Sequence, residues 1–465
     1  MTDKFYNEYK MEIGSIVEKL RNNQIAFFCG AGAVSDFTKI TWKDLFDGSL
    51  DLDNTDIFDY YKLASYYELV KDRATLLQTV TDKFNKKPNN QNFSKHIKNL
   101  LKLPITEFWT TNYDDIIETM IENKIGIKPS VIYNSKSLSR YKENKKYKVY
   151  KLNGSIEDLD SLVVTEGDYN NYYYKQKLLF EHLKKELVLK SFVFLGYSFA
   201  DKLVLDCLTE INQVFDKSSN VHYRIAVKDN NKKNFQKLEN DYFFKYYNIK
   251  TIYVNSFDEI DDLLEHIYAL YKMKNIFISG SFRNLTPEQE DRANNLCKEL
   301  VSNLIKNGYN IYTGDGRRLG SYIISNATKE LAEKSDMYMQ ERLKIMPYID
   351  HTFTNKSADH PDRIDHIKRM IEDCSASIFL YGQSKDDKPS QGVIEEYNQS
   401  KINKLKIIPV ASTGFAAEKI LDDMEFHLEV PHYLEVYKEK LKDEKLCVEK
   451  IAQLIIEILN NNNPA

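Results

Sequence analysis

Short apolar runs alternate along this chain with longer stretches in which apolar residues recur at helical spacing. The first run, Ile25–Cys29, ends directly at Gly30-Ala31-Gly32. A short apolar run that stops at glycines predicts a buried parallel strand followed by a tight turn. Similar runs predict further strands at 107–111, 148–152, 191–196, 222–227 and 249–254.

Helical spacing fills the intervals between these predicted strands. In residues 1–20, apolar side chains recur at roughly helical spacing, a pattern that predicts an amphipathic helix: Tyr9, Met11, Ile13, Ile16, Val17 and Leu20. Helices are also expected at 42–50, 58–85, 92–102 and 257–271. Strands that alternate with helices indicate a doubly wound parallel sheet.

The same pattern restarts at Lys274. Strands are predicted at 275–281, 309–313, 342–346, 376–381 and 406–410, with helices between them, such as 287–306 and 361–373. We therefore expect an α/β protein with two doubly wound Rossmann-like parallel-sheet domains, the first with helical insertions. The expected domains are residues 1–273 and 274–465.

Composition narrows the class of protein. Among 465 residues, 42% are hydrophobic and 12% aromatic, enough for packed cores and too many for a mainly disordered chain. A net charge of -4 argues against nucleic acid as a partner. No apolar run reaches membrane-spanning length and the N-terminus has no signal-peptide core, so we expect a cytoplasmic protein without a membrane partner.

The cysteines and histidines give no sign of a metal site. The five cysteines are scattered and odd in number, which favours reduced, buried thiols. No C-x-x-C pair occurs, so the sequence lacks a zinc ribbon. The nine histidines show no metal-ligand spacing either.

Four predicted strands of the first domain end in polar or glycine-containing segments. These segments are Gly30-Ala31-Gly32-Ala33-Val34-Ser35, Thr111-Asn112-Tyr113-Asp114, Asn153-Gly154-Ser155 and Gly196-Tyr197-Ser198-Phe199-Ala200-Asp201. Open α/β sheets bind ligands at the carboxyl ends of their strands. A single G-x-G turn is weak support for a nucleotide site, but four such ends together indicate one.

As an ordered set, these motifs resemble the sirtuin-like domain of bacterial anti-phage NADases, over about residues 1–270. The resemblance implies NAD⁺ as the substrate. It implies that Gly30, Ala31, Gly32 and Ser35 hold the pyrophosphate and that Gly196 and Ser198 line the adenosine side. Asn112 would be a catalytic residue that holds the ribose and orients attack near the nicotinamide, and Thr111 would also bind the cofactor. Asp114 would fix the Asn112 loop, and a helix N-cap is an equally good role for it. Tyr197 and Phe199 are expected in the core.

Asn153 departs from the family pattern. The segment Lys151-Leu152-Asn153-Gly154 resembles the K-(L/M)-H-G motif, in which the histidine is the base that acts on the NAD ribose. Imidazole accepts a proton near neutral pH, whereas an amide only forms hydrogen bonds. Loss of a general base costs roughly 10²–10⁴-fold in rate, so this form should be strongly impaired. Either the histidine was lost naturally or it was replaced deliberately to trap a ligand; the intact surroundings favour the second.

Three functions remain open for the first domain. Water is the expected acceptor, since no zinc ribbon frames a peptide cleft, and this makes the domain an NAD⁺ hydrolase by family. A naturally inactive NAD-binding sensor or scaffold is a second interpretation, and a sirtuin-type protein deacylase is a third.

The second half resembles the SLOG nucleotide-sensor domain, although less closely. Small-residue loops at strand ends and nearby cationic groups suit a diphosphate. The expected signal-binding residues are Ser279, Gly280, Ser281, Gly314, Gly316, Arg317, Arg318, Lys368, Arg369, Lys388, Glu396, Thr413 and Gly414. The adjacent arginines Arg317 and Arg318 suit a solvated face as well, and Glu396 suits the first turn of a helix.

The order of sirtuin-like and SLOG domains is that of Thoeris defence effectors. The resemblance implies that a TIR-domain partner makes a cyclic ADP-ribose isomer, which binds the SLOG domain and activates NAD⁺ destruction. It also implies a homotetramer.

Overall fold

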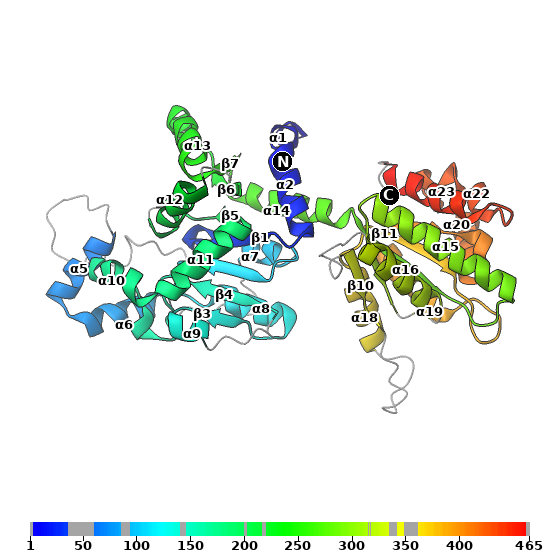
Figure 1. The fold of residues 1–465 in the computed structure, drawn as a ribbon, viewed down its shortest axis with the longest axis horizontal. Helices are drawn as coiled ribbons and strands as arrows, with labels where there is room; N and C mark the ends of the chain where they lie inside the picture. The colour runs from blue at the N-terminus through cyan, green and yellow to red at the C-terminus, as the bar shows by residue number, and fades with distance from the viewer. Residues whose placement is uncertain are drawn as a thin grey trace, which may run out of the picture. The chain divides into compact units, whose positions relative to one another are not determined.

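The computed structural model describes residues 3–35, 60–84, 94–139, 146–199, 202–215, 220–314, 316, 318–333, 342–347 and 361–461. The helix expected at 42–50 lies outside these residues. The chain divides into two compact units, residues 1–268 and 269–465 (Figure 1), and each is described by itself.

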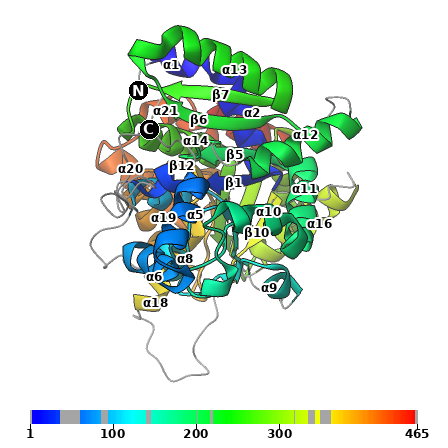
Figure 2. The same ribbon diagram turned by 90° about the vertical axis from the view of Figure 1, so that its left-hand side faces the viewer.

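A seven-stranded parallel sheet forms the centre of the first unit. Its strand order is β3-β4-β2-β1-β5-β6-β7, and Figure 2 shows β1, β5, β6 and β7 following one another. The strands are β1 (Ile25–Cys29), β2 (Glu107–Thr110), β3 (Ser130–Ile132), β4 (Lys148–Lys151), β5 (Ser191–Leu195), β6 (His222–Val227) and β7 (Ile249–Val254). Every residue of β1 and β5 is buried, as expected for central strands covered on both faces.

Helices cover this sheet, and two helical segments are inserted between its strands. They are α1 (Asp3–Glu8), α2 (Lys10–Arg21), α5 (Tyr60–Val70), α6 (Arg73–Phe84), α7 (Lys95–Leu100), α8 (Ile116–Ile125), α9 (Ser135–Ser139), α10 (Glu166–Lys175), α11 (Lys177–Leu189), α12 (Leu203–Phe215), α13 (Lys233–Tyr247) and α14 (Asp258–Lys272). Helices α5 to α7 lie between β1 and β2, and α10 and α11 lie between β4 and β5. The predicted helical insertions of the first domain are therefore confirmed.

The differences from the sequence prediction are local. The N-terminal helix is broken at Tyr9, and the helix expected at 58–85 is two helices separated by Lys71 and Asp72. Strand β3 was not predicted, because three residues are too few to show a period.

The second unit contains a five-stranded parallel sheet of order β10-β9-β8-β11-β12. Its strands are β8 (Asn275–Ser281), β9 (Asn310–Thr313), β10 (Leu343–Ile345), β11 (Ala376–Tyr381) and β12 (Lys406–Pro409). All five had been predicted. Its helices are α15 (Pro287–Lys306), α16 (Leu319–Glu333), α18 (Pro361–Ile371), α19 (Gln391–Ile402), α20 (Phe415–Phe426), α21 (His432–Glu435), α22 (Lys438–Lys442) and α23 (Val448–Asn460).

Helix α15 shows how local sequence sets an element in this unit. Thr286 and Gln289 form a reciprocal capping box, and Pro287 occupies the first turn. Its apolar face, which includes Leu296, Leu300 and Leu304, packs into the core of the unit. Figure 1 shows α16 running beside it.

Both sheets reverse direction of winding beside their first strand. In the first unit the chain moves from β1 to β2 on one side and later returns to β5 on the other; in the second, β8 lies between β9 and β11. Such switch points are where open α/β sheets bind ligands. Among the described residues, no helix is both long and apolar enough to cross a membrane.

Candidate functional site

The ends of β1 and β5 are joined through their backbones. The N–H of Gly30 donates to the carbonyl of Leu195 at 2.9 Å, and the N–H of Gly32 donates to that of Gly196 at 2.9 Å. These bonds continue the β1–β5 ladder into the turns. The two turns therefore form one rigid unit at the switch point.

Glycine is required here because the two turns almost touch. A Cβ atom on Gly30 would lie 2.4 Å from the Gly196 carbonyl oxygen, and one on Gly196 would lie 2.1 Å from the Ala33 nitrogen. Gly196 also has φ +62°, which disfavours any residue with a side chain. Close packing of the turns is thus one structural reason for these glycines.

The segment after Gly30 is a short 3₁₀ helix, Ala31–Val34, in which Ala31 is exposed. The Ser35 hydroxyl donates to the Gly32 carbonyl at 2.9 Å, and Ser94 donates to the Ala33 carbonyl at 3.0 Å. The expected pyrophosphate residues therefore lie together in one braced turn.

Asn112 lies beside this turn because β2 is next to β1. Thr110 donates to the Cys29 carbonyl at 2.6 Å, and its hydroxyl accepts the N–H of Asn112 at 2.9 Å. The Asn112 amide nitrogen lies 3.4 Å from the Gly30 carbonyl oxygen. Thr111, between them, is half-buried.

Asn153 follows β4, the strand beyond β2, and only 3% of it is exposed. Its side-chain amide donates to the Tyr61 hydroxyl at 3.2 Å. Its backbone carbonyl accepts the N–H of Val163 at 3.0 Å. The turn after Asn153 requires glycine at position 154. Its φ is +86°, and a Cβ there would lie 2.3 Å from the Ser161 carbonyl oxygen. Helix α5 thus reaches the position of the expected base.

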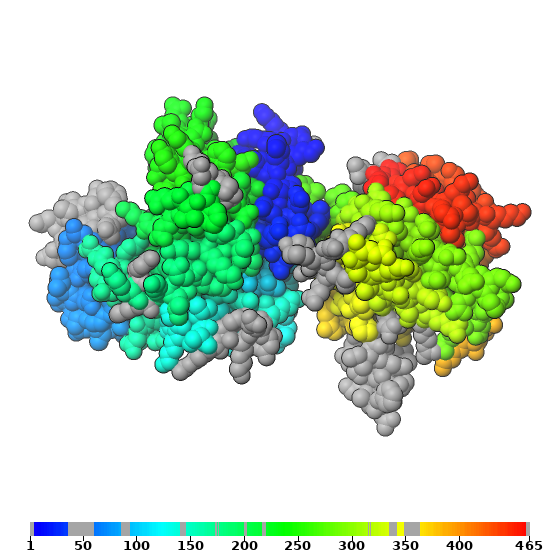
Figure 3. All heavy atoms as spheres, viewed as in Figure 1, coloured from blue at the N-terminus to red at the C-terminus, as the bar shows by residue number. Residues whose placement is uncertain are grey.

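A polar clamp holds α5 and α6 against the segment that follows Asn153. Arg73 contacts Asp168 at 2.7 Å, and the Glu166 N–H donates to Ser65 at 3.0 Å. Burial alone would raise the pKa of Asp168, but hydrogen bonds from Arg73 and two backbone N–H groups hold that pKa below its ordinary value. In the space-filling view, α5 and α6 (blue) lie at the surface of this unit (Figure 3).

A cluster of buried charged groups lies under the Asn112 loop. Lys151 is fully buried and contacts Glu118 at 3.0 Å. Asp114 accepts the N–H of Ile116, the first residue of α8, at 3.2 Å, but the N-cap residue of that helix is Asp115, one position later. Burial raises the pKa of Asp114 to about 6, against the opposing effect of Lys151.

The segment after β5 has a buried and an exposed side. Tyr197 and Phe199 are buried, which confirms their expected place in the core. Ser198 is exposed beside Gly196. Asp201 lies outside the described residues.

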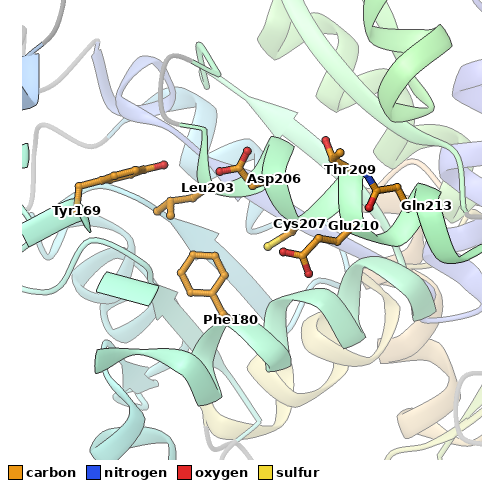
Figure 4. Close-up of a pocket in the computed structure, with 8 residues that line it drawn as sticks. All are labelled: Tyr169, Phe180, Leu203, Asp206, Cys207, Thr209, Glu210 and Gln213. Atoms are coloured by element: carbon orange, nitrogen blue, oxygen red, sulfur yellow. The ribbon is translucent and has the colours of Figure 1, made fainter. Parts of the chain in front are cut away.

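A separate cavity of about 350 Å³ lies between α10, α11 and α12. Figure 4 shows Phe180 and Cys207 together with the carboxylates of Asp206 and Glu210. Burial raises the pKa of Asp206. Its described lining contains none of the expected NAD-binding residues, so it is distinct from the strand-end site.

The second unit has a much tighter crevice between β8 and β9. It measures about 20 Å³ and is lined by residues that include Gly280, Gly314, Gly316 and Glu396. A Cβ atom on Gly316 would lie 2.4 Å from the Gly280 carbonyl oxygen. This volume holds about one water molecule, so a nucleotide requires the crevice to open.

Glu396 and Ser279 meet at this crevice. The Ser279 hydroxyl donates to the Glu396 carboxylate at 2.5 Å. Burial raises the pKa of Glu396 to about 7, and the bond from Ser279 and the charge of Arg363 oppose that rise. Ser281, at the end of β8, instead donates to the Gln383 carbonyl at 3.2 Å.

Other expected signal-binding residues are not among those that line the crevice. Arg318 is 53% exposed and pairs with Glu290 of α15 at 3.0 Å. Lys388 belongs to the loop after β11, where its N–H donates to Ser384. Thr413 accepts the N–H of Tyr381 at 2.7 Å, next to Gly414, which has open space around it.

Lys368 and Arg369 occupy the last turn of α18. Because α18 leads into β11, that turn lies toward the amino end of β11, at the opposite edge of the sheet from the crevice. The structure therefore does not bring these two residues together with Ser279 and Gly316. Arg317 lies outside the described residues.

Sequence reasoning missed three residues that shape the two sites: Tyr61, Lys151 and Gln383. Gln383 is buried and its side-chain oxygen accepts the N–H groups of Arg283 and Asn284 at 2.8 and 3.0 Å. The position of Lys151 within a strand, two residues before Asn153, was the one available sequence signal. Tyr61 and Gln383 carry none, since their partners are distant in sequence.

Comparisons with known proteins agree with this division. A SIR2-like domain model matches residues 106–252, and the model of the Sir2- and TIR-associating SLOG family matches residues 259–462. A protein named NAD(+) hydrolase ThsA from Bacillus cereus (strain MSX-D12) is 29% identical, over 96% of this chain and 97% of its own. Proteins of the same name from Enterococcus faecium and Acinetobacter baumannii (strain 532279) are 29% and 28% identical, over 95% and 90% of this chain and 95% and 91% of their own.

The chain thus joins a SIR2-like domain to a SLOG domain, each built on its own parallel sheet. Both domains, in this order, are shared with the relatives along almost their whole length. Together, the two domains and the similarity along almost the whole chain support its identification with the proteins named ThsA.

The glycine interlock gives a first prediction. Gly196→Ala should disrupt the unit, because its Cβ collides with the backbone of Gly32 and Ala33, and NAD⁺ binding should be lost. Gly126→Ala is a matched control: φ is +73° but nothing lies within 4 Å, so only the left-handed strain of roughly 1–2 kcal/mol remains. Thermal unfolding and NAD⁺ titration measure both. Equal effects of the two substitutions would contradict the interlock.

The buried Asp114 gives a pH-dependent prediction. Its pKa is raised in the fold, so the stability it contributes is present near pH 4 and is lost as pH rises through about 6. Asp114→Asn should raise the free energy of unfolding at pH 7.5 by roughly 2–3 kcal/mol and leave it unchanged near pH 4. Denaturant unfolding at both pH values measures this, with the exposed Asp160→Asn as control. An unaltered pH dependence would refute it.

Proposed function

We propose that this chain is an NAD⁺-binding effector of bacterial anti-phage defence, with a SIR2-like domain built for NAD⁺ hydrolysis and impaired by Asn153. The observation that carries this is the full-length similarity to proteins named NAD(+) hydrolase ThsA. The geometry supports it, because β1, β2, β4 and β5 bring Gly30, Asn112, Asn153 and Gly196 to one edge of the sheet.

The strand-end site supplies parts suited to different ends of the dinucleotide. The braced turn at Gly30–Ser35 presents exposed backbone at Ala31, where a pyrophosphate would lie. Asn112 and Asn153, from the two strands on one side, would meet the ribose that bears nicotinamide. Hydrolysis at that ribose needs a proton acceptor, which the Asn153 amide does not supply.

The described histidines of the first unit offer no evident substitute. His222 begins β6, at the amino edge of the sheet, and its ring accepts the N–H of Phe192 at 3.0 Å. His96 lies 3.1 Å from Asp261 of α14. His182 packs on Trp109 and Tyr150, and His266 stacks on Tyr6.

The C-terminal domain is proposed to sense a cyclic ADP-ribose isomer made by a TIR-domain protein. The match to a Sir2- and TIR-associating SLOG family supports this assignment. Because the crevice beside Gly280 and Gly316 is closed, such a ligand must favour a different conformation, and a ligand shifts an equilibrium only by its differential affinity. A homotetramer is part of this proposal.

Restoring the base tests the first half of the proposal. Asn153→His should raise NAD⁺ hydrolysis by roughly 10²–10⁴-fold, measured as nicotinamide release with and without cyclic ADP-ribose isomers. Asn153→Ala, which loses the bond to Tyr61 and supplies no base, should show no rise. Bound but uncleaved NAD⁺ in both variants would favour an inactive sensor or scaffold. Turnover of an acyl-lysine peptide by Asn153→His would favour a deacylase.

The paired glycines of the second unit test the sensor. In the Asn153→His background, Gly316→Ala should lower the isomer concentration that gives half-maximal stimulation at least about tenfold, because its Cβ would lie 2.4 Å from the Gly280 carbonyl oxygen and disfavours the closed crevice. Gly308→Ala, in the turn before β9, should leave the response unchanged, since a Cβ there has no atom within 4 Å. Isomer titrations of hydrolysis compare them. A normal response of Gly316→Ala would place the sensor elsewhere.

A further inference from the structure

Lys151 is a lysine with no exposed side-chain surface at the end of β4, two residues before Asn153. Its ammonium lies 3.0 Å from Glu118 Oε1 and donates at 3.0 Å to the Tyr113 carbonyl. It donates to the Asp114 carbonyl as well. Burying an ammonium group is costly unless it is paired and hydrogen-bonded. Lys151 meets that condition, because its three N–H donors have three acceptors.

All three acceptors belong to one short segment of chain. Tyr113 and Asp114 directly follow Asn112, and Glu118 lies in the first turn of α8. The Lys151 side chain therefore crosses from the strand that carries Asn153 to the loop that carries Asn112. Two of its three bonds are to the backbone of that loop, so they fix the course of the chain rather than neutralise a charge.

We propose that Lys151 is a positioning residue of the strand-end site, which holds Asn112 at a fixed place relative to residue 153. This inference rests on the proposed function, since it takes the site to bind NAD⁺. From the other side, the Asn112 loop is tied to Gly30 through Asn112 itself and to Cys29 through Thr110. Lys151 adds a side-chain tie toward β4, beside the backbone bond from the N–H of Ile156 to the Tyr113 carbonyl. The ribose end of NAD⁺ depends on it, whereas the pyrophosphate turn between β1 and β5 does not.

The test uses the double variant Lys151→Met/Glu118→Leu. Replacing a buried ion pair by apolar residues of similar size is often neutral for stability, yet this change removes both donors to the loop. The matched control is Lys190→Met/Glu107→Leu. That pair belongs to the same sheet, where Glu107 starts β2 and Lys190 precedes β5, at the edge opposite the site.

Binding of NAD⁺ and of ADP distinguishes a positioning role of Lys151 from a general loss of structure. The double variant should bind NAD⁺ about fivefold more weakly, with unchanged affinity for ADP, which lacks the nicotinamide ribose. The control should bind both normally. In the Asn153→His background, kcat should fall about 100-fold with a KM change below about tenfold, as expected for misplaced reacting groups.

The outcomes distinguish this proposal from the proposed function. If Asn153→His is inactive but the double variant selectively loses NAD⁺ binding, the proposed hydrolysis is contradicted and the positioning role of Lys151 is retained. An active Asn153→His variant in which the double variant matches the control would overturn the positioning role. No NAD⁺ binding by the unmodified chain would overturn both. If the double variant does not fold, Lys151→Gln/Glu118→Gln replaces it, because glutamine keeps the site polar but is one bond shorter.

Discussion

The interlock of the turns after β1 and β5 is the constraint on which the first domain depends. Gly32 donates to Gly196, and there is no room for a Cβ atom at Gly30, Gly32 or Gly196. The interlock fixes the backbone of the first turn at the switch point of the sheet. Every other part of the site is placed relative to it, since Thr110 and Asn112 bond to the carbonyls of Cys29 and Gly30.

Residue 153, the position of the expected base, is buried like a core residue. Asn153 lies under Tyr61 of α5, and α5 and α6 are held by the Arg73–Asp168 pair and by Ser65. An imidazole at residue 153 would keep a hydrogen-bonding partner in Tyr61 and gain a proton acceptor. The surroundings therefore impose a buried polar group at this position, and under the proposed function the identity of that group decides between hydrolysis and binding alone.

The sequence predicted strands well where an apolar run and a neighbouring glycine or polar residue both mark the same strand end. Strands such as β1, β6, β7 and β11 were predicted to their end residues, because each is an apolar run bounded by polar or glycine residues. The strand-end motifs were placed on one edge of the sheet, since parallel strands all present their carboxyl ends there. Strand β3 escaped, because three residues carry no period.

The sensor residues were harder to predict for a physical reason. A cation near a glycine loop in sequence suits a diphosphate equally well whether it lies at the crevice or on a solvated helix. Arg318 pairs with Glu290, and Lys368 lies at the far edge of the sheet. The direction in which each helix runs decides whether its cation lies at the crevice or on a solvated face. Composition gives no information on that direction. The same limit hid Lys151, whose partners are recognisable only once β4 is known to lie beside β2.

Both sheets have a switch point beside their first strand, but the carboxyl ends of the strands differ between them. In the first unit, the turn at Ala31 is exposed and its glycines are used to hold two turns together. In the second, Gly280 and Gly316 touch, Glu396 is bonded to Ser279, and Gln383 ties the loops after β8 and β11. A signal that enters there must separate groups that are already satisfied, so its binding energy is partly spent on opening. A ligand that binds only the open form is then a switch, because the closed form resists every ligand that does not replace those contacts.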